Sequence, residues 1–261
     1  MFEKELKVVL ETIKIAKDAI LEIYNQGFDV SIKSDNSVVT NADLTSEKII
    51  RESLISNFPT YAILSEETND NKDRLTNDYC FIVDPLDGTK DYVNKTNNFA
   101  INIALAYKHE IVLGVIAVPC RDIYYYAIKG QGAYKIEDGI VSQIHVSDRK
   151  EKLRMLTSQF FFNSNADFEN NPLIESLTPI GSSYKAGLIA EGKAEFCIKF
   201  DDHTKEWDTA PSEIIIREAG GVMSNMYGQE NKYNRENYVN TDGFIIANNL
   251  TVLNSMKKTR N

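Results

Sequence analysis

The sequence has little that would tie the chain together covalently or carry it into a membrane. Its 261 residues include only three cysteines, Cys80, Cys120 and Cys197, which are far apart and odd in number. This spacing fits neither a disulfide framework nor a zinc site, and we interpret the three as reduced thiols of a cytoplasmic protein. The longest apolar run, residues 111–118, is far shorter than the roughly 20 residues of a membrane helix. The first residues alternate charged and apolar side chains, so we expect no secretory signal.

Positive charge is also in short supply. The chain has 29 lysines and arginines against 38 acidic residues, a net charge of −9. Because nucleic-acid affinity comes from basic side chains that neutralise phosphates, we expect no nucleic-acid partner. A 43% hydrophobic fraction is ordinary for a globular protein, and the length suits one large domain or two small ones. A chain of this size buries enough surface to fold without a disulfide or a structural metal.

Hydrophobic periodicity predicts the elements of the first half. The spacing of apolar residues predicts one helix over 3–25, ended by Gly27, and a second over 43–57, capped by Asp43 or Thr45. Short apolar runs predict strands over 61–64, 79–83, 100–107, 111–118, 123–128 and 133–136. Short turns separate the last four of these runs, which favours an antiparallel meander.

The pattern changes near residue 150, where predicted strands and helices begin to alternate. The strands are predicted over 153–157, 195–198 and 244–247, and the helices over 184–191, 209–219 and 250–258. Such alternation favours a more parallel α/β arrangement. We therefore predict an amino-terminal α+β half, residues 1–145, and a carboxyl-terminal α/β half, residues 146–261.

The most informative segment is the end of the predicted strand over 79–83. It runs directly into two carboxylates, Asp84 and Asp87. Pro85 between them fixes one backbone angle, and Gly88 after them permits a tight turn. We expect this turn to aim both carboxylates at one point. Hard oxygen ligands gathered in this way suit Mg²⁺.

The same turn adds main-chain groups to the predicted site. The Leu86 carbonyl offers a further oxygen, and the N–H groups of Gly88 and Thr89 are placed to hold an anion. A strand, carboxylates and an anion-binding turn in this order favour metal-assisted phosphoryl chemistry. The alternative is an ordinary surface turn in which the aspartates are only turn formers.

Three other acidic segments of the sequence support the prediction of a metal site. Glu66 and Glu67 follow the predicted strand over 61–64, and Asp43 opens a predicted helix. Asp208 follows the only tryptophan and opens another helix. Each has a simpler explanation, since Asp43 and Asp208 suit helix N-caps and Glu67 suits an exposed charge. Their occurrence in one chain with the Asp84 turn favours a shared site.

Taken together, these segments resemble the inositol monophosphatase superfamily of Mg²⁺-dependent, lithium-sensitive phosphatases. The similarity runs from about Lys33 to Ala247, and its motifs follow the family's order. They are Lys33–Asp35, Thr40–Asp43, Ser65–Glu67, Asp84–Thr89, Trp207–Pro211 and Glu218–Gly221. The resemblance implies a layered α/β/α/β/α sandwich of the sugar-phosphatase type. One departure is Ser65, because the family usually has glycine before the paired glutamates.

The resemblance also implies a role for each of these residues. The ligands of two or three Mg²⁺ ions would be Glu66, Asp84, the Leu86 carbonyl, Asp87 and Asp208. Asp43 would orient the hydroxyl of Thr89, which positions the attacking water, and Glu67 would lie behind the metal ligands and support them. The N–H groups of Gly88 and Thr89 would bind the phosphate, and the attack would be direct and in line.

Within the superfamily, three segments resemble the 3′(2′),5′-bisphosphate nucleotidases of the CysQ type. They are Gly88–Tyr92, Gly181–Lys185 and Glu206–Ala210. Those enzymes remove the 3′-phosphate of adenosine 3′,5′-bisphosphate. The resemblance implies that the substrate is also contacted by Gly181, Ser182, Ser183, Lys185 and Asp208. Lys185 would pair with the 5′-phosphate; the alternative is a plain helix cap with Lys185 in solvent.

Another departure and two competing functions remain. The stretch Lys199–Glu206 is longer and more acidic than the Arg-Phe-Gly-Pro-Thr of the nucleotidases.

The nearer competing function is an inositol or other sugar monophosphatase, and the farther one is a non-catalytic nucleotide sensor. We expect a small phosphorylated substrate as partner, no membrane span, and a monomer or a homodimer. His203 is a further residue that we expect near the substrate.

Overall fold

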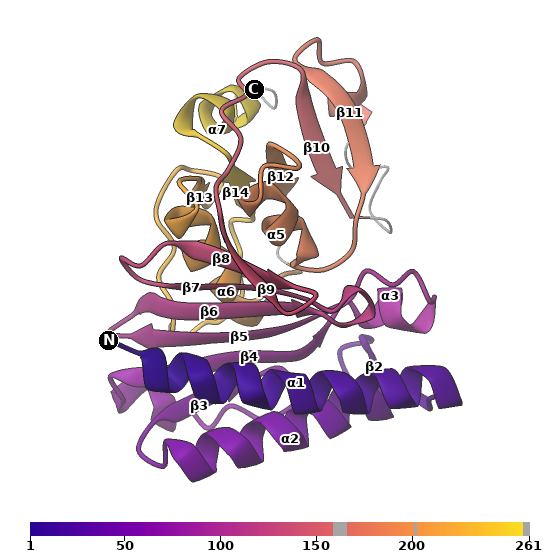
Figure 1. The fold of residues 1–261 in the computed structure, drawn as a ribbon, viewed down its shortest axis with the longest axis vertical. Helices are drawn as coiled ribbons and strands as arrows, with labels where there is room; N and C mark the ends of the chain where they lie inside the picture. The colour runs from indigo at the N-terminus through magenta and orange to yellow at the C-terminus, as the bar shows by residue number, and fades with distance from the viewer. Residues whose placement is uncertain (159–165, 201–202, 258–261) are drawn as a thin grey trace.

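The computed structural model describes residues 1–158, 166–200 and 203–257, and it has helices and sheets in alternating layers (Figure 1). Helices α1 and α2 form one outer layer, and a seven-stranded sheet lies on them. Helices α5 and α6 separate this sheet from a five-stranded sheet, whose outer face carries α7. The predicted α/β/α/β/α layering is confirmed.

The first layer follows the predicted helices closely. Helix α1 spans Glu3–Gln26 and ends at Gly27, whose φ of +114° is unfavourable for other residues. Helix α2 spans Asn41–Asn57, and its N-cap is Thr40. The predicted cap, Asp43 or Thr45, is therefore wrong. Asp43 instead lies in the first turn and accepts a hydrogen bond from the Thr40 N–H at 2.8 Å, which completes a capping box.

The larger sheet has the strand order β3-β4-β5-β6-β7-β8-β9. Its strands are β3 (Ala62–Ser65), β4 (Tyr79–Asp87), β5 (Ala100–Tyr107), β6 (Glu110–Val118), β7 (Ile123–Ile128), β8 (Ala133–Glu137) and β9 (Ile140–Ile144). β3 and β4 are parallel, and all later neighbours are antiparallel, so the predicted meander is confirmed. The prediction missed β9, which is mostly exposed and lacks the alternating pattern of a half-buried strand. A separate hairpin joins β1 (Val30–Ile32) to β2 (Val38–Thr40).

The smaller sheet has the order β11-β10-β12-β14-β13 and mixes both strand directions. Its strands are β10 (Leu153–Thr157), β11 (Ile174–Pro179), β12 (Phe196–Lys199), β13 (Val222–Ser224) and β14 (Phe244–Ala247). β10 is parallel to β11 and β12, whereas β14 is antiparallel to both of its neighbours. The longer helices here are α5 (Tyr184–Ala190), α6 (Glu206–Glu218) and α7 (Leu250–Lys257). Short helical turns are η1 (Asp73–Thr76), α3 (Thr89–Val93), η2 (Pro119–Arg121) and α4 (Ala166–Glu169). The predicted last residue of the final helix, Lys258, lies outside the described residues.

The middle layer is an apolar core that both halves of the chain share. Tyr125 of the larger sheet and Cys197 of the smaller one lie in the same buried cluster as Ile214 of α6. Gly114 of β6 permits a close contact between this strand and α6, because a Cβ at Gly114 would lie 2.8 Å from Pro211 Cα. Helix α6 is thereby held close against the sheet. The division of the chain at residues 145 and 146 stays a prediction. Within the described residues, no helix is both long and apolar enough to cross a bilayer.

Candidate active site

The end of β4 brings Asp84 and Asp87 to the same place. Side chains three residues apart on a regular strand point to opposite faces. Here Asp84 pairs with Asn102 of β5, whereas Asp87 pairs with Ala100, so β4 has one extra residue between them. Pro85 lies in this bulge, where its missing N–H costs no ladder hydrogen bond. The bulge turns both carboxylates toward α6.

Asp208 completes a group of three carboxylates. One oxygen each of Asp84, Asp87 and Asp208 lies within 4.8 Å of the others. A main-chain N–H holds one oxygen of each carboxylate: Leu86 donates to Asp84 at 3.0 Å, Ser183 to Asp87 at 2.5 Å and Lys205 to Asp208 at 2.6 Å. The remaining oxygens accept no hydrogen bond from any residue that the structure describes. Each carboxylate is thus oriented and still has an oxygen available for a ligand.

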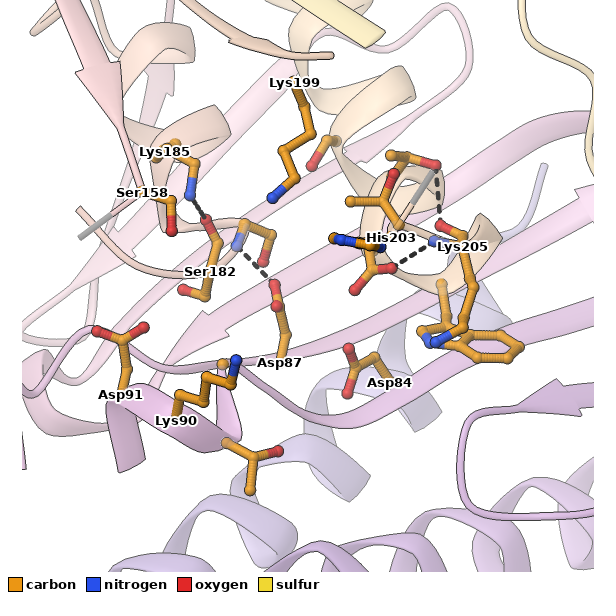
Figure 2. Close-up of a pocket in the computed structure, with 18 of the residues that line it drawn as sticks. Asp84, Asp87, Lys90, Asp91, Ser158, Ser182, Lys185, Lys199, His203 and Lys205 are labelled. Atoms are coloured by element: carbon orange, nitrogen blue, oxygen red, sulfur yellow. Dashed lines mark hydrogen bonds between the residues drawn. The ribbon is translucent and has the colours of Figure 1, made fainter. Parts of the chain in front are cut away.

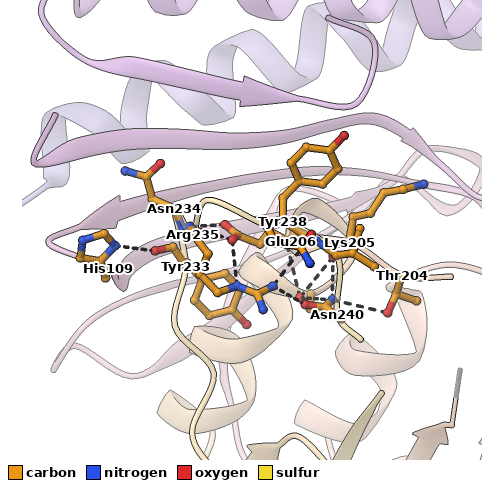
Figure 3. A network of polar contacts seen from close by, with 12 residues as sticks. His109, Thr204, Lys205, Glu206, Tyr233, Asn234, Arg235, Tyr238 and Asn240 are labelled. Atoms are coloured by element: carbon orange, nitrogen blue, oxygen red, sulfur yellow. Dashed lines mark hydrogen bonds and ion pairs between the residues drawn. The ribbon is translucent and has the colours of Figure 1, made fainter. Parts of the chain in front are cut away.

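A network of polar contacts holds Lys205 and Glu206 at the start of α6 (Figure 3). The buried carboxylate of Glu206 accepts hydrogen bonds from the main-chain N–H groups of Asn234, at 2.6 Å, and Arg235, at 2.9 Å. Asn240 donates to the Lys205 carbonyl at 2.8 Å. The loop that follows β13 therefore holds the first turn of α6, which contains Asp208.

Glu66 and Glu67 meet a lysine that precedes them by more than thirty residues. The Lys33 ammonium lies 3.1 Å from a Glu66 oxygen and 2.5 Å from a Glu67 oxygen. Glu66 lines the same cavity as the three aspartates. The Glu67 side chain is only 5% exposed, so the alternative of an exposed charge is wrong. The Ser65 hydroxyl donates to the buried carboxylate of Glu47, which lies on α2.

Burial destabilises the ionised form of the carboxyl groups at this site. Burial, with the charges of Glu66 and Asp87, raises the pKa of Asp84 well above its usual value. Burial also raises the pKa of Asp87, and burial with the charges of Asp87 and Glu66 raises the pKa of Asp208 to about 8. Burial raises the pKa of Glu67 to about 7, although Lys33 opposes the change. A divalent cation would offset this repulsion, and an all-oxygen donor set fits Mg²⁺.

Asp43 and Thr89 form a hydrogen-bonded pair beside this group. The Thr89 hydroxyl donates to Asp43 Oδ1 at 2.9 Å, and the other Asp43 oxygen accepts from the Thr40 hydroxyl at 2.6 Å. Burial raises the pKa of Asp43, which is 1% exposed. Thr89 lines the cavity and Asp43 lies behind it. The Thr89 oxygen is therefore placed between a buried carboxylate and the cavity.

The cavity beside these groups has a volume of about 730 Å³. Gly88 and Thr89 line it, and their N–H groups have no acceptor among the described residues. Gly88 has a φ of +89°, a backbone conformation that side chains with a Cβ rarely adopt. This turn presents two unpaired donors to the cavity, as an anion requires.

The opposite wall comes from the start of α5 (Figure 2). Ser182, Ser183 and Lys185 line the cavity, whereas Gly181 is not part of its lining. A Cβ on Gly181 would lie 2.3 Å from a carboxylate oxygen of Asp91, so glycine allows this contact. The Lys185 ammonium donates to the carbonyls of Ile180, at 3.1 Å, and Ser182, at 2.8 Å. Lys185 thus faces the cavity with its ammonium tied to the turn before α5.

The structure adds residues that the sequence did not single out. Asn102 is fully buried and contacts Asp87, Trp207 and Ser183. Its only sequence signal is a polar residue within the apolar strand over 100–107. In the atypical stretch, Lys199 and Lys205 line the cavity together with His203, as expected for His203. Asp201 and Asp202 of that stretch lie outside the described residues.

Comparisons with known proteins agree with this arrangement. The model of the "Inositol monophosphatase family" matches residues 2–259. The chain is 34% identical over 232 residues to the 3′(2′),5′-bisphosphate nucleotidase CysQ of Escherichia coli (strain K12), covering 86% of this chain and 92% of that protein. It is 35% identical over 227 residues to the protein of the same name from Aggregatibacter actinomycetemcomitans, covering 85% and 84%.

Solved structures share the fold. The crystal structure of CysQ from Bacteroides thetaiotaomicron has a TM-score of 0.76 and 28% identity, with 95% of this chain and 98% of that chain covered. An inositol monophosphatase of Thermotoga maritima has a TM-score of 0.81 at 23% identity, over 99% and 96% of the two chains. The predicted resemblance is confirmed, and the chain belongs to the inositol monophosphatase family of phosphatases.

Proposed function

We propose that this protein is a Mg²⁺-dependent 3′(2′),5′-bisphosphate nucleotidase. It hydrolyses the 3′-phosphate of adenosine 3′,5′-bisphosphate and releases AMP and phosphate. The observation that carries the proposal is one cavity with oriented carboxylates on one wall and the Ser182–Lys185 turn on the other. The relatives named CysQ support this choice within the family.

The residues present fit a magnesium site. Asp84, Asp87 and Asp208 would hold the ions through their free oxygens, with Glu66 and the Leu86 carbonyl as further ligands. Bound Mg²⁺ would offset the negative charge of the site, favour deprotonation of water and stabilise charge on the leaving oxygen. Glu66 would have to exchange part of its contact with Lys33 for the metal, and Glu67 would keep that lysine in place.

The chain's own residues would organise the attack. The Thr89 hydroxyl donates to Asp43, so its oxygen is oriented to accept a proton from the attacking water as its own proton passes to the Asp43 carboxylate. The water oxygen forms a bond to phosphorus, the bond from phosphorus to the 3′-oxygen breaks, and that oxygen takes a proton from a solvent water, while Asp43 later releases its proton to solvent. The N–H groups of Gly88 and Thr89 would bind the phosphate oxygens. Cys197 also lines the cavity, but burial raises the pKa of its thiol to about 11, which disfavours a thiolate nucleophile.

The wall of the cavity opposite the aspartates favours a substrate with a second phosphate, and so favours the nucleotidase over a sugar monophosphatase. A volume of about 730 Å³ suits a nucleotide-sized ligand. Lys185 and Lys199 line the wall opposite the aspartates, together with Ser182 (Figure 2). A substrate with one phosphate has no remote anion for these groups, whereas the 5′-phosphate would lie near them.

A panel of phosphate-release assays tests the proposal. We expect adenosine 3′,5′-bisphosphate to be hydrolysed with a kcat/KM at least about tenfold above that of inositol 1-phosphate, the equivalent of one charge-assisted hydrogen bond. The reverse preference would favour the sugar monophosphatase. Binding of the nucleotide without phosphate release would favour the non-catalytic sensor.

A further inference from the structure

Asn102 connects three parts of the site through one side chain. It lies on β5 directly opposite Asp84 and is 0% exposed. Its Nδ2 donates to Asp87 Oδ2 at 3.1 Å and to the Trp207 carbonyl at 3.3 Å. Its Oδ1 accepts a hydrogen bond from the Ser183 hydroxyl at 2.6 Å. The amide therefore joins β4, α6 and the start of α5.

These contacts fix the direction in which Asp87 points. Asp87 Oδ2 accepts hydrogen bonds from the Asn102 amide and the Ser183 N–H, so its Oδ1 is left for the cavity. The Trp207 carbonyl belongs to the residue before Asp208 on α6. The Asn102 amide thus sets the position of one carboxylate directly and of a second through the main chain.

The same contacts link the carboxylates to the opposite wall. Ser183 precedes α5 and uses its N–H for Asp87 and its hydroxyl for Asn102. Lys185, on the first turn of α5, lies two residues farther along. A shift of α5 when the cavity fills would change the hydrogen bonds that orient Asp87.

We propose that Asn102 is a positioning residue that orients Asp87 for the metal and couples it, through Ser183, to the α5 wall of the cavity. This inference rests on the proposed function, because it assumes a divalent cation at Asp87. Partners that orient metal ligands typically change metal affinity or activity by about 10- to 100-fold when they are lost.

The test compares three single alanine variants, and the double variant Asn102→Ala/Ser183→Ala, with wild-type protein, using MgCl₂ as the probe. Isothermal titration calorimetry without substrate gives the Mg²⁺ dissociation constant, and thermal unfolding in excess chelator gives the stability of the metal-free fold. The single variants are Asn102→Ala, Ser183→Ala and the control Asn248→Ala. Asn248 is 1% exposed and donates to the carbonyls of Ser147 and Arg149, and it does not line the cavity.

We expect Asn102→Ala to weaken Mg²⁺ binding about tenfold or more. Ser183→Ala keeps the N–H contact to Asp87 and should weaken Mg²⁺ binding about threefold. The double variant should bind Mg²⁺ no more weakly than Asn102→Ala alone, because the link between the two is already lost. Asn248→Ala should lower thermal stability and leave the Mg²⁺ dissociation constant unchanged.

The outcomes separate this inference from the proposed function. Wild-type protein that binds no Mg²⁺ would contradict the proposed function itself. Wild-type binding together with unchanged binding by both Asn102→Ala and Ser183→Ala would overturn the positioning role alone. If Asn102→Ala does not fold, Ser183→Ala decides the question, since it alters only a hydroxyl at the start of a helix. Weakening of equal size in Asn248→Ala would show a general effect of stability and would also overturn the inference.

Discussion

Replacing Asp87 by asparagine should separate the chemistry of the site from the stability of the fold. The change removes one negative charge with little change in volume. The new carboxamide oxygen can accept the hydrogen bonds that Ser183 and Asn102 now donate to Asp87 Oδ2. The local structure should therefore survive, while the oxygen facing the cavity is replaced by a nitrogen that cannot bind Mg²⁺.

The metal-free protein should become more stable. Two full charges 4.8 Å apart, the outer limit for oxygens of the three aspartates, repel by about 3.5 kcal/mol at an effective dielectric constant of about 20. The raised pKa values leave the carboxylates partly neutralised, which reduces the repulsion that full charges would have. A gain of even about 1 kcal/mol would raise the Tm by about 2–4 °C in a chain of this size.

The stability that Asp87→Asn gains in the absence of metal should also depend on pH. An acid whose pKa is higher in the folded state destabilises the fold once it is ionised in the unfolded chain. The pKa of Asp208 is raised to about 8. The loss of folding stability that this raised pKa causes therefore grows from about pH 4 and is complete above pH 8. Loss of the Asp87 charge should lower that pKa, so the Tm gain of Asp87→Asn in chelator should be larger at pH 8 than at pH 5.

Two assays check this prediction. The kcat with Mg²⁺ should fall by at least about a hundredfold, the scale of losing one group aimed at the transition state. Glu213→Gln is a matched control, since Glu213 is a buried carboxylate of α6 that does not line the cavity, and its kcat should change little. A fully active Asp87→Asn enzyme would show that the metal lies elsewhere, and a lower Tm in chelator would refute the account of charge repulsion.

Three further predictions concern the metal, the water and the substrate. Excess chelator should abolish turnover, Mg²⁺ should restore it and raise the Tm, and Li⁺ should inhibit; undiminished turnover in chelator would contradict the metal site. Thr89→Ala should lower kcat about a hundredfold, whereas Thr89→Ser retains the hydroxyl and should keep most of it; equal loss in both variants would argue against the proton path. Lys185→Met should lower kcat/KM for adenosine 3′,5′-bisphosphate about tenfold and leave hydrolysis of adenosine 3′-monophosphate nearly unchanged; equal effects on both substrates would remove Lys185 from the 5′-phosphate site.

The sequence predicted elements best where burial imposes a regular period. Strand β5, for example, is buried along nearly its whole length and has the bounds predicted from its apolar run. Strands β9 and β11 were missed because they are mostly exposed or half-buried at the two sheet edges. Helix α3 was missed because five residues are too few for a helical period to show.

The site itself shows which kind of information lies outside local pattern. Asp84 and Asp87 are close in the sequence, yet a regular strand would direct them to opposite faces. They share a site because the bulge at Pro85 adds one residue. The turn itself can be predicted from the sequence, because Pro85 and Gly88 are residues typical of turns. Asn102 has no such signal, because its role depends on partners 15, 81 and 105 residues away. Those partners come together because both sheets pack against α5 and α6. A residue of this kind can therefore be identified from the three-dimensional structure and not from a sequence motif.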